Sequence, residues 1–299
     1  MSASTPSIPV AVAPRVHFGK VAIVGTGALG GSVAGALRTH GLADELWGLD
    51  PVNAESALQA GLIDRVAASL AEAVEGADLV VLAAPVAVNC AVVADPDLRG
   101  RMASQACLTD VSSTKSSMVS AALAGLGERR GRFVASHPIA GSDRSGPGAS
   151  RADLFDGRAL LMCPTPHSDE DVVARIEAMW LAMGARVARM SPAHHDLLFA
   201  EVSHWPHAVA FALAAAIGEG PRADDAVRYH GAGLRDTTRV GGSPADLWAG
   251  ILLDNRAPVL AAARAFRAEL DRIQSAIESG DRAALTEALA RGERWRSAF

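Results

Sequence analysis

His137 is the side chain of this sequence whose type and position best suit proton transfer. The run Arg132–Ser136 before it predicts a buried strand, which places the imidazole at the carboxyl end of that strand. Because histidine titrates near neutral pH, an imidazole there can accept the proton of a hydroxyl group while a hydride leaves the same carbon. A single histidine is more often structural than catalytic, so a catalytic role for His137 depends on the elements around it.

A glycine-rich segment suits the binding of a dinucleotide. Val21–Val24 predicts a short buried strand, which runs into Gly25-Thr26-Gly27-Ala28-Leu29-Gly30 and then into a helical pattern through Arg38. In such a unit the first glycine makes the turn, the second lets a pyrophosphate approach the backbone, and the third lets helix and strand pack closely. The helix N-terminus then offers N–H groups and a partial positive charge. We therefore predict that residues 25–30 bind the cofactor.

Asp50 ends a second predicted strand, Glu45–Asp50, and indicates which dinucleotide is bound. A carboxylate at this point accepts hydrogen bonds from the adenine ribose and repels a 2′-phosphate, which favours NAD over NADP. Ala84 and Pro85 end the apolar strand predicted at Ala77–Pro85, at the same edge of the sheet. Small residues there let a cofactor lie close, although ordinary close packing explains them equally well.

Strands and helices alternate as far as Met190, which predicts an α/β Rossmann-type domain with a doubly wound, mostly parallel sheet. Further strands are expected at 159–163 and 185–190, with a helix at 169–183 between them. Another strand, Cys107–Val111, delivers Ser113 and Lys115 to the edge that carries His137. We interpret Lys115 as capping a helix or holding Asp110, rather than as a catalytic lysine.

The remainder of the chain predicts an all-helical domain without strands. Residues 196–218 are expected to be helical with an interruption at Pro206, and residues 229–242 are glycine-rich and expected to be irregular. One side of the helix expected at 257–278 carries an apolar seam whose spacing from Val259 is that of a coiled coil. This side comprises Val259, Leu260, Ala263, Phe266, Leu270, Ile273 and Ile277. The seam either packs within the chain or builds a homodimer, and we favour the homodimer. The predicted organisation is therefore a flexible tail (1–18), an NAD-binding Rossmann domain (19–190) and a helical substrate and dimerisation domain (191–299).

Composition excludes several classes of protein. A hydrophobic share of 49% over 299 residues suits a globular chain with two domains. The net charge of −5 leaves no basic excess for nucleic acid, and no apolar run approaches the roughly twenty residues of a membrane span. The three cysteines, Cys90, Cys107 and Cys163, lie far apart, and the N-terminus lacks a signal-peptide pattern. We therefore expect a cytoplasmic protein with buried thiols.

Glu201, His204 and His207 lie three residues apart along one predicted helix, as metal ligands sometimes do. Two histidines and one acid at helical spacing do not complete a metal site without a further ligand. We therefore predict no metal.

Five motifs, in matching order from Lys20 to about Asn255, resemble those of the prephenate dehydrogenase family. This family includes the arogenate and cyclohexadienyl dehydrogenases of tyrosine biosynthesis. The motifs are Gly25–Ser32; Asp110, Ser113 and Lys115; Ser136–Gly141; Ser203–Ala210; and Asp236, Thr238 and Arg239. The resemblance implies a Rossmann domain followed by a helical dimerisation domain, as the patterning predicts.

The resemblance also implies an activity: oxidative decarboxylation of prephenate to 4-hydroxyphenylpyruvate, with NAD+ taking the hydride. It implies that His137 is the catalytic histidine on the ring 4-hydroxyl, and that Ser113 bonds the same hydroxyl and helps to place the nicotinamide. Arg239 matches the arginine that binds a substrate carboxylate, and His207 matches a histidine near the substrate side chain. Asp143 stands where the family often has glutamate, which shortens its reach by one methylene.

His204, in the same motif as His207, is also expected among the substrate-binding residues. The expected substrate carries two carboxylates, which suit the bidentate guanidinium of Arg239. Three other readings remain open at this point: an arogenate or dual-specificity cyclohexadienyl dehydrogenase, a β-hydroxy-acid dehydrogenase that uses Lys115, and a nucleotide sensor without catalysis.

Overall fold

The computed structural model describes residues 16–141 and 146–298, and the chain divides into two compact units, up to His195 and from Asp196 onward. The division falls within helix α8 (Pro192–Phe199), whereas the patterning placed it at 190/191. Residues 1–15 of the predicted tail lie outside the described residues, and Phe18 already begins the first strand.

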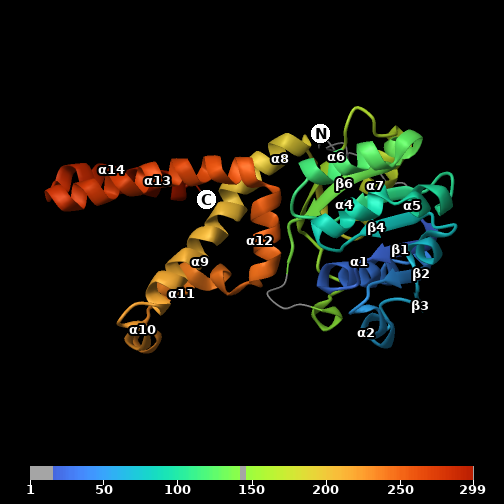
Figure 1. The fold of residues 1–299 in the computed structure, drawn as a ribbon, viewed down its shortest axis with the longest axis horizontal. Coiled ribbons are helices and arrows are strands. Elements are labelled where there is room, and N and C mark those ends of the chain that lie inside the picture. Colours follow the sequence, from blue (N-terminus) through green and yellow to red (C-terminus); the bar gives the residue numbers. More distant parts are fainter. Residues whose placement is uncertain (1–15, 142–145, 299) are drawn as a thin grey trace, which may run out of the picture. The chain divides into compact units, whose positions relative to one another are not determined.

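The first unit is built on an eight-stranded sheet with the order β3-β2-β1-β4-β5-β6-β7-β8 (Figure 1). All neighbouring strands run parallel except β6 and β7, which are antiparallel. The strands are β1 (Phe18–Val24), β2 (Ala43–Leu49), β3 (Arg65–Val66), β4 (Leu79–Leu82), β5 (Cys107–Asp110), β6 (Phe133–Pro138), β7 (Ala159–Cys163) and β8 (Arg186–Arg189). The mostly parallel, doubly wound sheet predicted from the sequence is confirmed.

Helices cover both faces of this sheet, and each face has its own hydrophobic core. Val21 and Ile23 of β1 pack in one core, while Ala22 and Val24 pack in the other, because successive strand residues point to opposite faces. Helices α1 (Ala28–Thr39), α2 (Ala54–Gln59) and α7 (Glu170–Ala182) contribute to the first core. Helices α3 (Leu70–Val74), α4 (Val86–Ala94), α5 (Pro96–Arg101) and α6 (Ser116–Gly125) contribute to the second. Burial on both faces explains why the strands read as continuous apolar runs.

The parallel strands β1, β4, β5 and β6 all end at one edge of the sheet. Gly25, Ala83 and Val111 follow the first three of these strands, and His137 lies near the end of the fourth. In open α/β sheets this carboxyl edge is where ligands bind. The topology therefore gathers the glycine-rich turn and the predicted proton acceptor at one edge.

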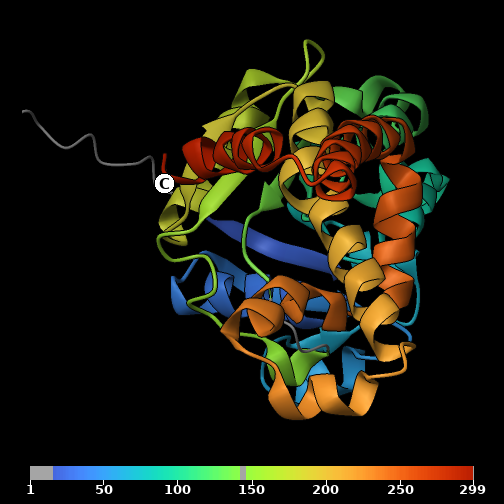
Figure 2. The ribbon, with the colours of Figure 1, turned by 90° about the vertical axis from the view of Figure 1, so that its left-hand side faces the viewer.

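The second unit is helical, and no strand follows β8 in the chain described as far as residue 298. Its helices after α8 are η3 (Ala200–His204, a π-helix), α9 (Trp205–Gly218), α10 (Ala223–Tyr229), α11 (Ala232–Thr238), η4 (Arg239–Gly242), α12 (Ala245–Asp254), α13 (Arg256–Ser279) and α14 (Arg282–Arg296). Figure 2 shows these helices in gold, orange and red. The prediction that residues 229–242 are irregular is wrong, since α11 and η4 form there.

Pro206 does not break the helical path, contrary to expectation. It lies in the first turn of α9, where a missing N–H is tolerated, and the irregularity precedes it as the π-helical turn η3. Gly280 terminates α13 with φ +67°, and the Asp281 carboxylate accepts the N–H groups of Ala283 and Ala284 at the start of α14.

None of the described helices is both long enough and apolar enough to cross a membrane.

Candidate active site

The glycine-rich turn between β1 and α1 has the geometry of a dinucleotide cradle. Gly25 has φ +91°, and a Cβ there would lie 2.5 Å from the backbone nitrogen of Ala84. A Cβ at Gly30 would lie 1.9 Å from the carbonyl oxygen of Gly25, so only glycine lets helix and turn meet. A Cβ at Gly27 would meet nothing within 4 Å. The middle glycine therefore faces open space, as the approach of a pyrophosphate requires.

Helix α1 offers its first N–H groups without a competing cap. Its N-cap residue, Gly27, has no side chain to bond them, and no acidic residue lies in the first turn. The amides of Ala28 and Leu29 open this helix, whose N-terminus carries a partial positive charge. The residues present thus fit a pyrophosphate at this point.

Asp50 follows β2 and ties it to the glycine-rich turn. Its Oδ2 accepts the backbone N–H of Thr26 at 2.9 Å, and the carboxylate also accepts N–H groups of Val52 and Asn53. Desolvation raises the pKa of Asp50, but these hydrogen bonds together outweigh it and bring the pKa below its usual value. Asp50 is therefore an anion at neutral pH, as ribose recognition requires.

Ala84 and Pro85 lie beside the same turn, directly after β4. The contact between the Ala84 backbone and Gly25 shows that close packing is one reason for small residues here. That either residue also touches the cofactor stays a prediction.

His137 is buried at the end of β6, where its Nδ1 lies 2.8 Å from Nε2 of His195. The two rings meet edge to face with centroids 5.0 Å apart, and His195 is fully buried. One nitrogen of this pair must donate and the other accept. When His137 donates from Nδ1, its tautomer presents a lone pair on Nε2.

A buried ion pair holds the ends of β5 and β6 together. Lys115 Nζ lies 2.6 Å from Asp110 Oδ2 and donates to the carbonyl of Ser136 at 2.7 Å. Asp110 Oδ1 accepts the backbone N–H of Ser136 at 3.0 Å. Both ends of the pair are inaccessible to solvent, and Ser136 is the residue before His137. The interpretation that Lys115 holds Asp110 is confirmed.

Ser113 is half-buried in the segment between β5 and α6. The preceding residue, Ser112, accepts a hydrogen bond from the Asn89 amide at 3.1 Å, and its backbone N–H donates to Asp110. These bonds fix the path of the chain on both sides of β5's end. The role of Ser113 toward substrate stays a prediction.

Two of the predicted substrate-binding residues, His207 and Arg239, lie in the second unit. The ring of His207 stacks on Trp248 with centroids 3.5 Å apart and an interplanar angle of 17°, and its Nδ1 lies 2.8 Å from the Ser203 carbonyl. Desolvation by burial lowers the pKa of His207; the Ser203 carbonyl raises it, and the positive charge of Arg239 lowers it further. Arg239 is exposed at the start of η4. The pair thus presents a neutral imidazole and a cation.

His204 is 1% exposed and lies behind Trp248, with ring centroids 6.3 Å apart. Its Nδ1 lies 3.0 Å from the Asn255 amide, which also donates to the Asp196 carbonyl at 2.7 Å. These contacts support Trp248 and thereby the stacked His207. Direct contact of His204 with substrate stays a prediction.

Asp143 lies outside the described residues. Over residues 16–141 and 146–298, no group of three or more His, Cys, Asp and Glu side chains could hold a metal ion.

The motifs did not indicate three residues that contact the predicted site residues. They are His195 beside His137, Asn53 beside Asp50 and Trp248 beside His207. His195 lies 58 positions from its partner His137. No periodicity or spacing in the sequence reports such a contact, although a second histidine beside a predicted domain boundary was a signal that could have been weighed.

Comparison with known proteins accounts for both units. The family model described as the nucleotide-binding domain of prephenate dehydrogenase matches residues 33–189, and the one described as its dimerization domain matches residues 191–291. Cyclohexadienyl dehydrogenase of Zymomonas mobilis is 31% identical over 268 residues, covering 88% of this chain and 90% of the relative.

Solved structures of similar proteins agree with the family that these comparisons indicate. Prephenate dehydrogenase from A. aeolicus, in complex with hydroxyphenyl propionate and NAD+, is 32% identical with a TM-score of 0.84, covering 94% of this chain and 98% of its own. Arogenate dehydrogenase from Synechocystis is 26% identical with a TM-score of 0.76, covering 93% of this chain and 99% of its own. The resemblance inferred from the motifs is therefore confirmed, and the chain belongs to the prephenate dehydrogenase family.

Proposed function

We propose that this protein oxidatively decarboxylates prephenate to 4-hydroxyphenylpyruvate, with NAD+ as the hydride acceptor. The observation that carries the proposal is the buried His137–His195 pair at the sheet edge that also bears the dinucleotide cradle. A proton acceptor beside a nicotinamide site is what oxidation of a carbon-bound hydroxyl needs.

His137 supplies the base. In the proposed reaction His137 donates from Nδ1 to Nε2 of His195, 2.8 Å away. This tautomer leaves Nε2 of His137 to accept a proton, and the same hydrogen bond stabilises the imidazolium that results. The hydroxyl proton moves to Nε2 as the C–O bond becomes a carbonyl. Loss of the ring carboxylate as CO2 moves the electron pair of the broken C–C bond into the ring and onto the oxygen, and the resulting phenolate recovers a proton from the imidazolium or from water. The ring becomes aromatic, so the protein has only to orient the substrate and to hold one proton during the reaction.

The cofactor is NAD, which supplies the hydride acceptor when bound. Gly27 leaves room for its pyrophosphate, the first turn of α1 donates N–H groups to it, and Asp50 accepts from its adenine ribose. The lowered pKa of Asp50 keeps a negative charge at this point, which disfavours the 2′-phosphate of NADP.

Arg239 and His207 bind the substrate. The guanidinium pairs with a carboxylate through two parallel hydrogen bonds. His207 is neutral at pH 7 because burial and Arg239 hold its pKa down. It therefore provides no negative charge to pair with an ammonium group. Prephenate carries a keto group where arogenate carries an ammonium, and this environment favours the keto acid.

The protein acts as a homodimer assembled through its helical unit. Part of the apolar seam of α13 is exposed within one chain, with Ile277 at 61% and Leu270 at 48%, whereas Val259 is buried. An exposed stripe at this spacing is typical of a helix that meets a partner.

His137→Asn tests the proposal. We expect kcat with prephenate to fall about 10²- to 10⁴-fold, because the base is lost, while the Kd for NAD+ changes little. Formation of 4-hydroxyphenylpyruvate and NADH is measured at steady state, with prephenate and arogenate compared in the wild type. The exposed His167 provides the matched control His167→Asn.

Unchanged turnover in His137→Asn would remove His137 from the mechanism. A wild-type kcat/KM higher for arogenate than for prephenate would overturn the choice of substrate.

A further inference from the structure

Both carboxylate oxygens of Asp50 are already engaged in this structure. Oδ1 accepts the backbone N–H groups of Val52 and Asn53, each at 2.9 Å. Oδ2 accepts the backbone N–H of Thr26 at 2.9 Å and the side-chain amide of Asn53 at 3.1 Å. An ionised carboxylate offers about four acceptor positions, so these donors fill it. A ribose hydroxyl therefore needs one of them to leave.

Only the Asn53 amide can leave without moving the main chain. The Thr26 N–H belongs to the glycine-rich turn, and the Val52 and Asn53 N–H groups lie just before helix α2. The Asn53 side chain is only half-buried and rotates about its own bonds. Asn53 is the N-cap residue of α2 but makes no side-chain cap hydrogen bond, so the helix does not depend on its amide.

We propose that the Asn53 amide occupies, in the free protein, the acceptor position on Asp50 that an adenine-ribose hydroxyl takes on binding, and that Asn53 thereby sets the affinity for NAD. The inference rests on the proposed cofactor, and it is independent of which cyclohexadiene is the substrate. It makes Asn53 a determinant of cofactor affinity, in addition to the ribose-binding carboxylate.

Replacement of the Asn53 amide by a ribose hydroxyl, which we call the exchange, lowers the affinity for NAD. Each binding event must first break the hydrogen bond between Asn53 and Asp50. Asp50 stays ionised in the neutral range: desolvation raises its pKa, but the N–H donors around it outweigh desolvation. A hydrogen bond to an ionised acceptor is stronger than one between neutral groups. Removing the amide leaves the Thr26 N–H bond to the carboxylate in place and opens one acceptor position.

The test measures binding of NAD+ by isothermal titration calorimetry to the wild type, Asn53→Ala and Asn53→Leu. Both variants lose the side-chain donor, and leucine keeps its approximate size. We expect the Kd for NAD+ to fall about three- to tenfold in both. Val52→Ala is the matched control: its side chain is 80% exposed, its N–H donor is retained, and its Kd should stay within about twofold of the wild type.

A second ligand separates exchange from a general loosening of the loop. With an NAD+ analogue that lacks both the 2′- and the 3′-hydroxyl of the adenine ribose, the gain in Asn53→Ala should disappear, because no hydroxyl is left to take the opened position. An equal gain with both ligands, an unchanged Kd or a raised Kd would each overturn the inference. Wild-type protein that fails to bind NAD+ would refute the cofactor itself, whereas wild-type binding with unchanged affinity in Asn53→Ala would refute only the exchange.

Discussion

The buried pair of His137 and His195 is the arrangement at the residue scale on which the proposed chemistry depends most. A neutral imidazole has one donor and one acceptor nitrogen, so a partner on Nδ1 decides what Nε2 can do. The 2.8 Å contact from His195 supplies that partner from α8, and the strand β6 supplies His137 itself. We therefore infer that His195 is a positioning residue for the proposed base.

His195→Phe tests this role, because phenylalanine fills the space but accepts no hydrogen bond. We expect kcat to fall about 10- to 100-fold, by analogy with outer-shell partners of histidines at metal sites, with the Kd for NAD+ unchanged. Loss of the acceptor also destabilises the imidazolium, so the apparent pKa on the acidic limb of the kcat profile should fall. His195→Gln, whose amide oxygen can accept from Nδ1, should restore most of the rate.

His194→Phe is the matched control for this experiment, since His194 is the exposed neighbour on the same helix. A pH profile of His195→Phe identical to that of the wild type would refute the positioning role, whatever the change in rate.

The proposed substrate binding by Arg239 and its influence on His207 can both be measured. Arg239→Gln should raise the KM for prephenate about 10- to 100-fold, through loss of a charge-assisted hydrogen bond, and leave kcat nearly unchanged. The pKa of His207 is lowered first by desolvation and further by the charge of Arg239, so it should rise in the variant. Titration of His207 by NMR checks the direction. A constant His207 pKa would show that Arg239 does not act on this ring.

At the scale of elements, local sequence patterns predicted most of the architecture of the first unit. The order of strand, glycine turn and helix, and the position of Asp50 after the second strand, depend on neighbouring residues and were predicted correctly. The two-residue strand β3 was missed because Arg65–Val66 is too short for any periodicity to show. Helix α4 was missed because its valine-rich run has no polar face to give a helical period.

Contacts between residues far apart in the sequence explain the features that the sequence patterns did not predict. Residues 229–242 were expected to be irregular because of their glycines, yet α11 and η4 pack against α9. A Cβ at Gly241 would lie 2.8 Å from the Ala210 carbonyl of α9, so this glycine serves close helix packing. The His137–His195 contact and the bond from Thr26 to Asp50 are likewise set by the tertiary fold.

The glycine-rich turn gives a prediction that separates folding from binding. Gly30→Ala places a methyl group against the Gly25 carbonyl, which is backbone and cannot rotate away, so we expect a loss of about 1–3 kcal/mol and a Tm several degrees lower. Gly27→Ala meets open space at φ −67°, so its Tm should stay near that of the wild type while the Kd for NAD+ rises about tenfold or more.

Thermal unfolding and NAD+ titration of these two variants check this division. The opposite result, a stable Gly30→Ala and a destabilised Gly27→Ala, would contradict the assigned roles of the two glycines.

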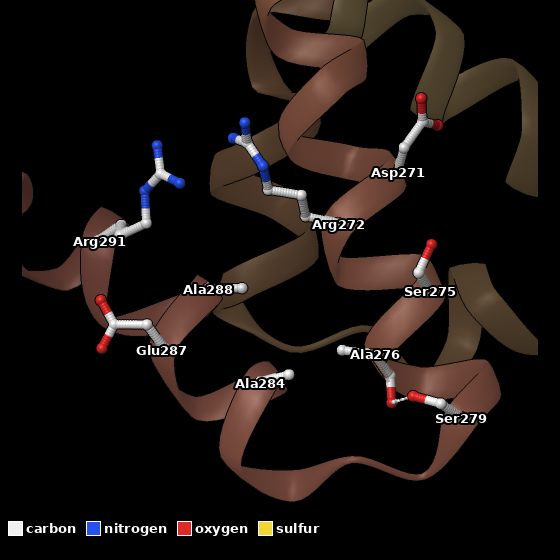
Figure 3. Close-up of a pocket in the computed structure, with 9 residues that line it drawn as sticks. All are labelled: Asp271, Arg272, Ser275, Ala276, Ser279, Ala284, Glu287, Ala288 and Arg291. Carbon is white, nitrogen blue, oxygen red and sulfur yellow. Dashed lines mark hydrogen bonds between the residues drawn. The ribbon is translucent and has the colours of Figure 1, made fainter.

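At the scale of the whole molecule, the seam of α13 is only partly covered by the described residues of its own chain. Val259 is buried and Phe266 meets Trp205, whereas Leu270 and Ile277 are exposed. Helix α14 packs beside α13 on another side, where residues of the two helices line a groove of about 570 Å³ (Figure 3). The groove residues Asp271, Arg272 and Ser275 occupy different helical positions from the seam. The exposed part of the seam is where we propose that a second copy of the chain packs.

The double variant Leu270→Glu/Ile277→Glu tests this assembly. Buried carboxylates on a dimer seam are strongly unfavourable, so we expect the wild type to elute as a dimer and the variant as a monomer in size-exclusion chromatography with light scattering. Ala268→Glu is the matched control, because Ala268 is exposed on α13 away from the seam and should leave the dimer intact. A variant that remains dimeric would show that the two copies meet through another face, and the coiled-coil spacing of α13 would then need a different explanation.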